Sequence, residues 1–154
     1  MKYVIGIDPD SKKHGVATYC NGKLTRLDAM HLMELMAYLT NLMESCDFND
    51  LIEFHIENIL SVNAVYKDRM AARGNAAVHR KMSNSVGRCQ QSQVEVERMI
   101  ERIFSPDAII KHKPSKMWKD QNGKKQFEKV TGWKGRSNED TRSAAYFGWL
   151  GVSK

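Results

Sequence analysis

The stretch that most constrains the fold is residues 2–8, K-Y-V-I-G-I-D, close to the start of the chain. Its apolar residues follow one another almost without alternation, a pattern typical of a strand covered on both faces and hence central in a sheet. The strand ends on Asp8. A charged carboxylate beside a buried strand is costly unless it is hydrogen-bonded, paired with a cation or bound to a metal. Asp8 therefore either opens an Asp-Pro turn or belongs to a functional site.

The order of the predicted elements indicates an α/β fold. Asn21-Gly22 is a strong hairpin signal, and it joins the first strands into an antiparallel meander. Later strands arrive through helical crossovers, which place each new strand parallel to a neighbour. We therefore expect a five-stranded mixed sheet flanked by helices, in a single domain spanning residues 1–154. The expected strands are 2–8, 16–20, 23–27, 51–59 and 107–111, and the expected helices are 29–45, 83–104, 124–131 and 137–150.

Three turn and cap predictions accompany these elements. Asp28 is expected to cap the helix that begins near residue 29, because aspartate accepts hydrogen bonds from the first free backbone N–H groups. Pro114 is expected to start a helical turn that runs to Trp118 and is broken by Gln121-Asn122-Gly123. Residues 60–82 have no regular pattern and are expected to form a long loop, which is usually functional or mobile in a compact domain.

Composition excludes several classes of protein. No apolar run approaches the roughly 20 residues that a membrane-spanning helix needs. The N-terminus shows no signal-peptide pattern, and the three cysteines show no C-x-x-C spacing, so we expect a reducing, cytoplasmic location and neither disulfides nor a thiolate zinc site. The five histidines lack metal-ligand spacing, so any metal would be held by carboxylates.

Positive charge is concentrated in one segment. The chain carries a net charge of +6, and the stretch from Lys111 to Arg136 holds nine lysines or arginines against two acids. Such a segment is the usual footprint of a polyanion. The aromatic residues Trp118, Phe127 and Trp133 lie among these lysines and could stack on bases, although core aromatics would give the same pattern. The candidate nucleic-acid-binding residues are Lys67, Arg69, Arg73, Arg80, Lys81, Lys113, Lys116, Lys119, Lys124, Lys125 and Arg136.

Further carboxylates are expected to converge on Asp8. If the strand 51–59 lies beside the first strand, Glu57 comes next to Asp8, and Asp140, preceded by Glu139, is available at the start of the last helix. A divalent cation relieves repulsion between such acids, and hard oxygen ligands suit Mg²⁺ or Mn²⁺. Two such ions about 3.5–4 Å apart can activate a water and stabilise the leaving oxygen of a phosphodiester.

Each of these acids also has an alternative role. Strand alternation would allow Glu57 to face solvent, and Asp140 would fit a capping box opened by Ser137.

Four segments resemble the RuvC-type Holliday-junction resolvases of the RNase H-like superfamily. Residues 5–17, I-G-I-D-P-D-S-x-x-x-G-V-A, look like the family's first motif. The stretches H-I-E-N (55–58), S-V-G-R-C-Q-Q-S (85–92) and D-T-R-S-A-A (140–145) are similar to its later motifs. The chain departs from the pattern at Asp10, where the family usually has glycine, and at Ser143, where it usually has a further acid.

The resemblance implies an RNase H-like, Mg²⁺-dependent endonuclease that cuts branched DNA, above all four-way junctions. Asp8, Glu57 and Asp140 would be its catalytic metal ligands, with Asp10 or Glu139 compensating for Ser143. Mn²⁺ would substitute for Mg²⁺, and no organic cofactor or membrane is implied. The active form would be a homodimer, and the short chain favours a phage version.

Other roles follow for residues around these acids. Lys113 or Lys116 would steady the phosphate, and residues 61–82 would reach into the junction. Two alternatives remain open: an inactive protein that only binds branched DNA, and a nuclease acting on RNA or RNA–DNA hybrids.

Overall fold

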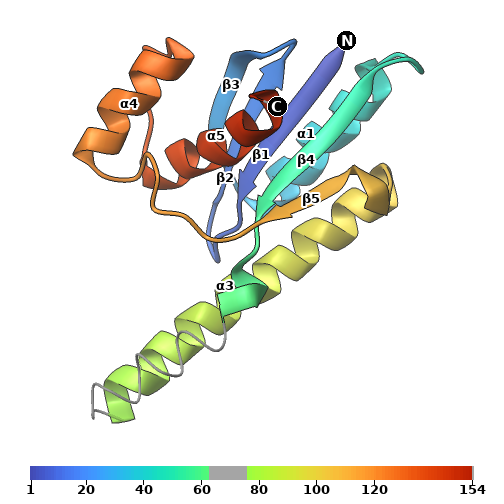
Figure 1. Cartoon of the computed structure of the whole chain (residues 1–154). Helices are drawn as coiled ribbons and strands as arrows, with labels where there is room; N and C mark the ends of the chain where they lie inside the picture. Colours follow the sequence, from blue (N-terminus) through green and yellow to red (C-terminus); the bar gives the residue numbers. More distant parts are fainter. Residues whose placement is uncertain (63–75, 154) are drawn as a thin grey trace.

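A central five-stranded mixed sheet organises the chain in the order β3-β2-β1-β4-β5 (Figure 1). It is seen in a computed structural model that describes residues 1–62 and 76–153. The antiparallel meander and the two parallel strands predicted from the sequence are confirmed, because β1 pairs antiparallel with β2 and parallel with β4. The strands are β1 (Lys2–Asp8), β2 (His14–Cys20), β3 (Lys23–Met30), β4 (Leu51–Glu57) and β5 (Ile109–His112).

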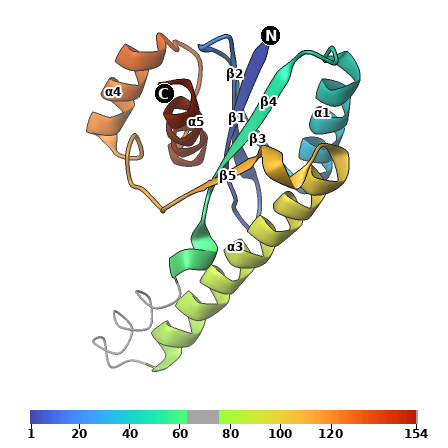
Figure 2. The ribbon, with the colours of Figure 1, turned by 45° about the vertical axis from the view of Figure 1, so that its right-hand side comes forward.

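Helices cover both faces of the sheet (Figure 2). Helices α1 (Leu32–Ser45) and α3 (Ala76–Ile103) pack on one face, over a core that includes Ile5, Ile7 and Phe54. Helix α5 (Glu139–Val152) lies on the other face, and α4 (Gln121–Thr131) packs against α5. Two short 3₁₀ turns, η1 (Ile59–Val62) and η2 (Pro106–Ala108), connect these elements. No helix within the described ranges is long and apolar enough to cross a membrane.

The Asn21-Gly22 hairpin forms as predicted, with both residues at positive φ, 48° and 83°. The cap assigned to Asp28 is wrong, because β3 continues through this residue to Met30 and Asp28 pairs instead with Arg26 at 3.1 Å. Helix α1 begins after His31, whose backbone N–H donates to Glu34 Oε2 at 2.8 Å. The meander is therefore longer and the helix shorter than the sequence pattern suggested.

The segment between β5 and α5 also differs from the prediction. The expected helical turn from Pro114 to Trp118 is wrong, and residues 113–120 are irregular with a turn at 117–119. Helix α4 begins three residues before residue 124, because Asp120 Oδ1 accepts a hydrogen bond from Gly123 N at 2.6 Å and caps it. Gln121-Asn122-Gly123 is thus the first turn of the helix and not a break.

Two of the three aromatic residues among the lysines belong to the core. Trp118 and Phe127 are 2% and 0% exposed, and they pack with Tyr146 beneath α4 and α5. The interpretation that they stack on bases is therefore wrong, because their rings have no access to a ligand. Trp133 is half-buried against the same cluster. Burial of these rings fixes the path of the loop that leads into α4.

Candidate metal and active site

Two neighbouring parallel strands bring Asp8 and Glu57 to the same edge of the sheet. β1 and β4 run in register, with Ile7 opposite Ile56, so the last residue of each strand lies at their common carboxyl end. Asp8 is 4% exposed and Glu57 is 6% exposed, so the alternative in which Glu57 faces solvent is wrong. The two acids are buried side by side, as the order of elements predicted.

The start of α5 brings Asp140 to the same edge. A Cβ on Gly15, which pairs with Asp8 across the sheet, would overlap the backbone of Asp140 and Thr141. The missing side chain therefore lets the first turn of the helix approach β2. The capping box runs from Asn138 to Thr141, whose N–H donates to Asn138 Oδ1 at 2.8 Å, and not from Ser137 to Asp140. Asp140 is consequently free of a capping role.

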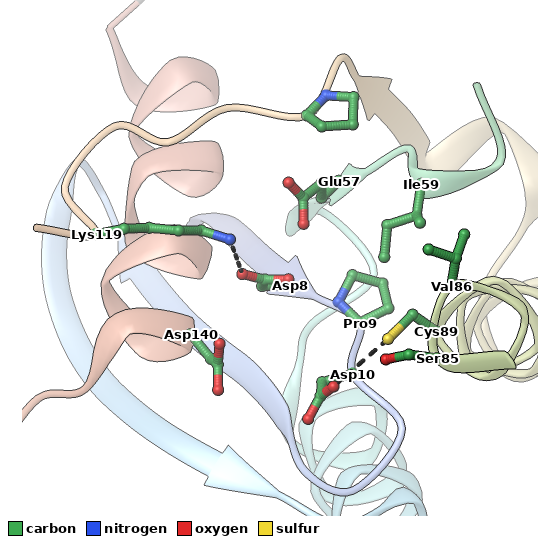
Figure 3. A pocket seen from close by; sticks show the side chains of 11 residues that line it. Asp8, Pro9, Asp10, Glu57, Ile59, Ser85, Val86, Cys89, Lys119 and Asp140 are labelled. Atoms are coloured by element: carbon green, nitrogen blue, oxygen red, sulfur yellow. Dashed lines mark hydrogen bonds and ion pairs between the residues drawn. The ribbon is translucent and has the colours of Figure 1, made fainter. Parts of the chain in front are cut away.

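These acids line one open cavity of about 290 Å³ (Figure 3). Asp8, Glu57 and Asp140 contribute to it from three different elements, and Asp10 contributes from the turn after β1. Of the two acids expected to compensate for a missing fourth ligand, Asp10 is at the cavity and Glu139 is exposed outside its lining. The lining residues are Asp8, Pro9, Asp10, Glu57, Ile59, Ser85, Val86, Cys89, Pro114, Lys119 and Asp140.

The fourth acid that the resemblance would lead one to expect is a buried serine. Ser143 is 1% exposed, and its Oγ has no hydrogen-bond partner within the described part of the chain. It lies outside the lining of the cavity. Among the residues that line the cavity, α5 therefore contributes Asp140, and the further carboxylate is that of Asp10 in the turn after β1.

Burial and mutual repulsion perturb the acids. Burial, reinforced by the neighbouring charge of Asp8, raises the pKa of Glu57 to about 8. Burial also raises the pKa of Asp140, with further contributions from Asp8 and Asp10. A cation bound beside these carboxyl groups would favour their ionised forms and so lower their pKa values.

A side chain on helix α3 holds the residues that directly follow β4. Gln93, fully buried on α3, accepts a hydrogen bond at Oε1 from Ile59 N at 2.7 Å. Its Nε2 donates to Asn58 Oδ1 at 3.1 Å and to Glu97 Oε1 at 2.8 Å. This network anchors the residue after Glu57 to α3, so the backbone that carries Glu57 cannot shift freely. This role of Gln93 could not be predicted from the residue order, which indicates only that Gln93 lies on the long helix.

Lys119 is the basic residue that reaches the acids. Its Nζ lies 3.3 Å from Asp8 Oδ2, and its side chain is 29% exposed (Figure 3). Lys113 and Lys116, which we expected to steady the phosphate, are exposed and lie outside the lining of the cavity, and their contact with a phosphate stays a prediction. Sequence reasoning placed Lys119 among the nucleic-acid-binding residues but could not single it out, since its position depends on an irregular turn.

The carboxylate oxygens at this cavity are suitable ligands for a hard divalent cation, but in this structure the acids are not grouped around a single position. Carboxylate oxygens from Asp8, Asp10, Glu57 and Asp140 are the ligands that Mg²⁺ and Mn²⁺ prefer. Asp8 Oδ2 is buried, and the ammonium of Lys119 lies 3.3 Å from it. Over these same ranges, no three acidic, histidine or cysteine side chains are grouped to hold an ion. Metal binding would therefore require these side chains to move.

The remaining candidate nucleic-acid-binding residues lie on other elements or outside the described part of the chain. Arg80 and Lys81 on α3 are exposed, as are Lys125 on α4 and Arg136 before α5. Lys124 is half-buried and pairs with Glu128 at 3.8 Å. Three others, Lys67, Arg69 and Arg73, lie outside the described residues.

Comparisons with known proteins identify the fold. No protein-family model and no curated protein sequence matches the chain. A solved structure, described as T. thermophilus RuvC in complex with Holliday junction substrate, has a TM-score of 0.57 and 13% sequence identity. The match covers 99% of this chain and 94% of that one. The chain therefore has the RuvC-type, RNase H-like fold that its sequence motifs predicted.

Proposed function

We propose that the protein is a metal-dependent endonuclease that cuts branched DNA, with the four-way junction as its preferred substrate. The observation that carries this proposal is the cavity at the carboxyl ends of β1 and β4, which is lined by four carboxylates from three parts of the chain. The same fold in a RuvC chain bound to a Holliday junction supports the choice of substrate. The net charge of +6 favours a polyanion.

The acids have distinct tasks in this proposal. Asp8 and Glu57 would hold Mg²⁺, or Mn²⁺ in its place, from the fixed strand ends, and Asp140 would complete the set from α5. Asp10 supplies the further carboxylate that α5 lacks at Ser143. A divalent ion bound there supplies an activated water and stabilises the leaving oxygen of a phosphodiester. The cavity is open, so a DNA phosphate can reach these side chains.

The DNA would lie over the exposed lysines and arginines around the cavity. Lys113 lies directly before Pro114, which lines the cavity, and Lys116 lies two residues after it; both would contact phosphates next to the scissile one. A symmetric junction requires two paired cuts, so the active form in this proposal is a homodimer. The long helix α3, from residue 83 onward, is our candidate for its interface (Figure 1).

One observation favours a second function, in which the protein binds branched DNA without cutting it. Ser143 replaces an acid that the related pattern contains, and no three carboxylates are grouped around an ion site within the described ranges. Loss of turnover with retention of binding would follow if Asp10 does not compensate. Dependence of nicking on a metal separates the two functions, because binding alone persists in EDTA.

The test is cleavage of a labelled four-way DNA junction by the purified protein in Mg²⁺ or EDTA. We expect paired, symmetric nicks near the branch in Mg²⁺ only. Asp8→Asn should reduce the rate by at least about a hundredfold, since it removes a metal-binding charge while keeping the shape of the side chain. Asp107→Asn, at an exposed acid in η2, is the matched control and should cut at the wild-type rate.

Binding without nicks, unaffected by Asp8→Asn, would establish the non-cutting function. Preferential cleavage of an RNA–DNA hybrid in competition with the junction would instead identify a ribonuclease H-type activity. Single nicks at unrelated positions in the two strands would contradict the homodimer.

A further inference from the structure

Lys119 lies where a cation is needed by the acids of the cavity. Its Nζ forms an ion pair with Asp8 Oδ2 at 3.3 Å, and the carboxylates of Glu57 and Asp140 are drawn around the same space (Figure 3). The ammonium therefore contacts one buried carboxylate directly and lies close to two further acids.

The backbone that carries Lys119 is fixed from α5. Arg142, which is 7% exposed, donates from Nε to Trp118 O at 2.7 Å and from Nη2 to Lys119 O at 2.6 Å. These charge-assisted hydrogen bonds hold two successive carbonyl groups with one planar side chain. Arg142 is two residues from Asp140 on the same helix, so one element positions both a carboxylate and the lysine opposite it.

The turn itself is constrained by packing. Trp118 adopts a positive φ of 63° while its ring is buried, an arrangement that few non-glycine residues adopt without support. Gly123, in the first turn of α4, lies against the backbone of Trp118, where a Cβ would be only 2.5 Å from Trp118 Cα. A lysine that only contacted DNA would not need such a fixed backbone, because long exposed side chains reach phosphates without one.

We propose that the Lys119 ammonium occupies the cation position beside Asp8 when no divalent ion is bound. It competes with the divalent ion for Asp8 and must move away from Asp8 when the ion binds. This inference rests on the metal site of the proposed function. An ammonium and a divalent ion within a few ångströms repel each other strongly in a partly buried cavity. Within the described ranges, no three acids are grouped around an ion site, and Lys119 pairs with Asp8. In our proposal this is the state in which the Lys119 ammonium takes the place of the ion.

The first test is calorimetric titration of the full chain with Mn²⁺, without DNA. Lys119→Met should bind Mn²⁺ at least about tenfold more tightly than the wild type, because the competing charge is gone. Lys129→Met, which removes an exposed lysine in the last turn of α4, is the control and should stay within about twofold of the wild type. Lys119→Gln provides a second variant with a polar side chain in case methionine disturbs folding.

The second test locates the ammonium. In crystals grown with MnCl₂, the anomalous signal should lie within ligand distance of Asp8, with Lys119 Nζ withdrawn from Asp8 Oδ2. Equal Mn²⁺ affinity in the wild type and both Lys119 variants would overturn the inference, as would Mn²⁺ bound beside an intact Lys119–Asp8 pair. Absence of binding in every chain would instead remove the metal site of the proposed function. Asp8→Asn should abolish binding, which ties the signal to this site.

Discussion

At the scale of single residues, Glu57 is held in an electrostatic conflict that one substitution can relieve. It is buried beside Asp8, and its pKa is raised to about 8 by burial and by that neighbouring charge. The folded protein therefore binds a proton at Glu57 more tightly than the unfolded chain does. The stabilisation is complete below the ordinary glutamate pKa of 4.5 and is lost as the pH rises through about 8.

We expect Glu57→Gln to show this effect in urea unfolding with EDTA present. Wild type and variant should have similar free energies of unfolding near pH 4.5, the ordinary glutamate pKa. Above a pH of about 8 the variant should be more stable by an amount on the order of a few kcal/mol, because glutamine stays neutral. A difference that does not change between these pH values would show that Glu57 ionises normally in the folded protein.

The acids that line the cavity could be predicted from the sequence, whereas the lysine beside them could not be singled out. Asp8 and Glu57 could be placed because strand ends are set by hydrophobic pattern and crossover geometry. Lys119 could not be distinguished from its neighbouring lysines, because its place depends on the positive φ of Trp118 and on two hydrogen bonds from Arg142. Neither feature has a pattern that is visible in the residue order.

At the scale of secondary-structure elements, the seating of α5 on the sheet decides where Asp140 lies. Gly15→Ala should force the first turn of α5 away from β2, because the added methyl group would overlap the backbone of Asp140. We expect a loss of about 1–3 kcal/mol in the free energy of unfolding, together with weaker Mn²⁺ binding.

Gly87→Ala is the matched control for this change. Gly87 is exposed on α3, and a Cβ there would meet nothing within 4 Å. Alanine should therefore stabilise the helix by about 0.5–1 kcal/mol. Chemical denaturation of both variants measures the two effects, and a Gly15→Ala protein as stable as the wild type would contradict the close contact.

The existence and order of the elements were predictable, whereas several boundaries depended on caps that the pattern alone does not settle. Asp28 and Ser137 are both good N-cap residues, but Asp28 stays in a strand because β3 pairs with β2 through Val16 opposite Asp28, and Asn138 caps α5 instead of Ser137. The start of α4 was also predicted too late. Glycine usually weakens a helix, but Gly123 lies in the first turn of α4 and packs against the backbone of Trp118.

At the scale of the whole molecule, positive charge is distributed unevenly with respect to the sheet. The segment from Lys111 to Arg136 begins in β5, passes the cavity, contains α4 and ends shortly before α5. The β2–β3 hairpin, with Lys23, lies at the opposite ends of the strands from Asp8. We infer that DNA approaches the cavity edge and leaves the hairpin end free.

Salt dependence of junction binding measures this orientation. Lys116→Gln should reduce the slope of log K against log salt concentration by about 1, the value for one lost phosphate contact. Lys23→Gln removes the same charge at the hairpin and should leave the slope unchanged. Equal reductions for the two variants, measured by fluorescence anisotropy in EDTA, would show that DNA binds without a preferred face.

The close seating of α5 also bears on how far such sequences can diverge. Gly6 and Gly148 let β1 and α5 approach until a Cβ on Gly6 would overlap the backbone of Ala144. A few small residues along one seam thus constrain how closely the helix can lie on the sheet, and most other positions do not enter this contact. Chains that are only 13% identical, such as this one and the RuvC chain, can therefore share one scaffold.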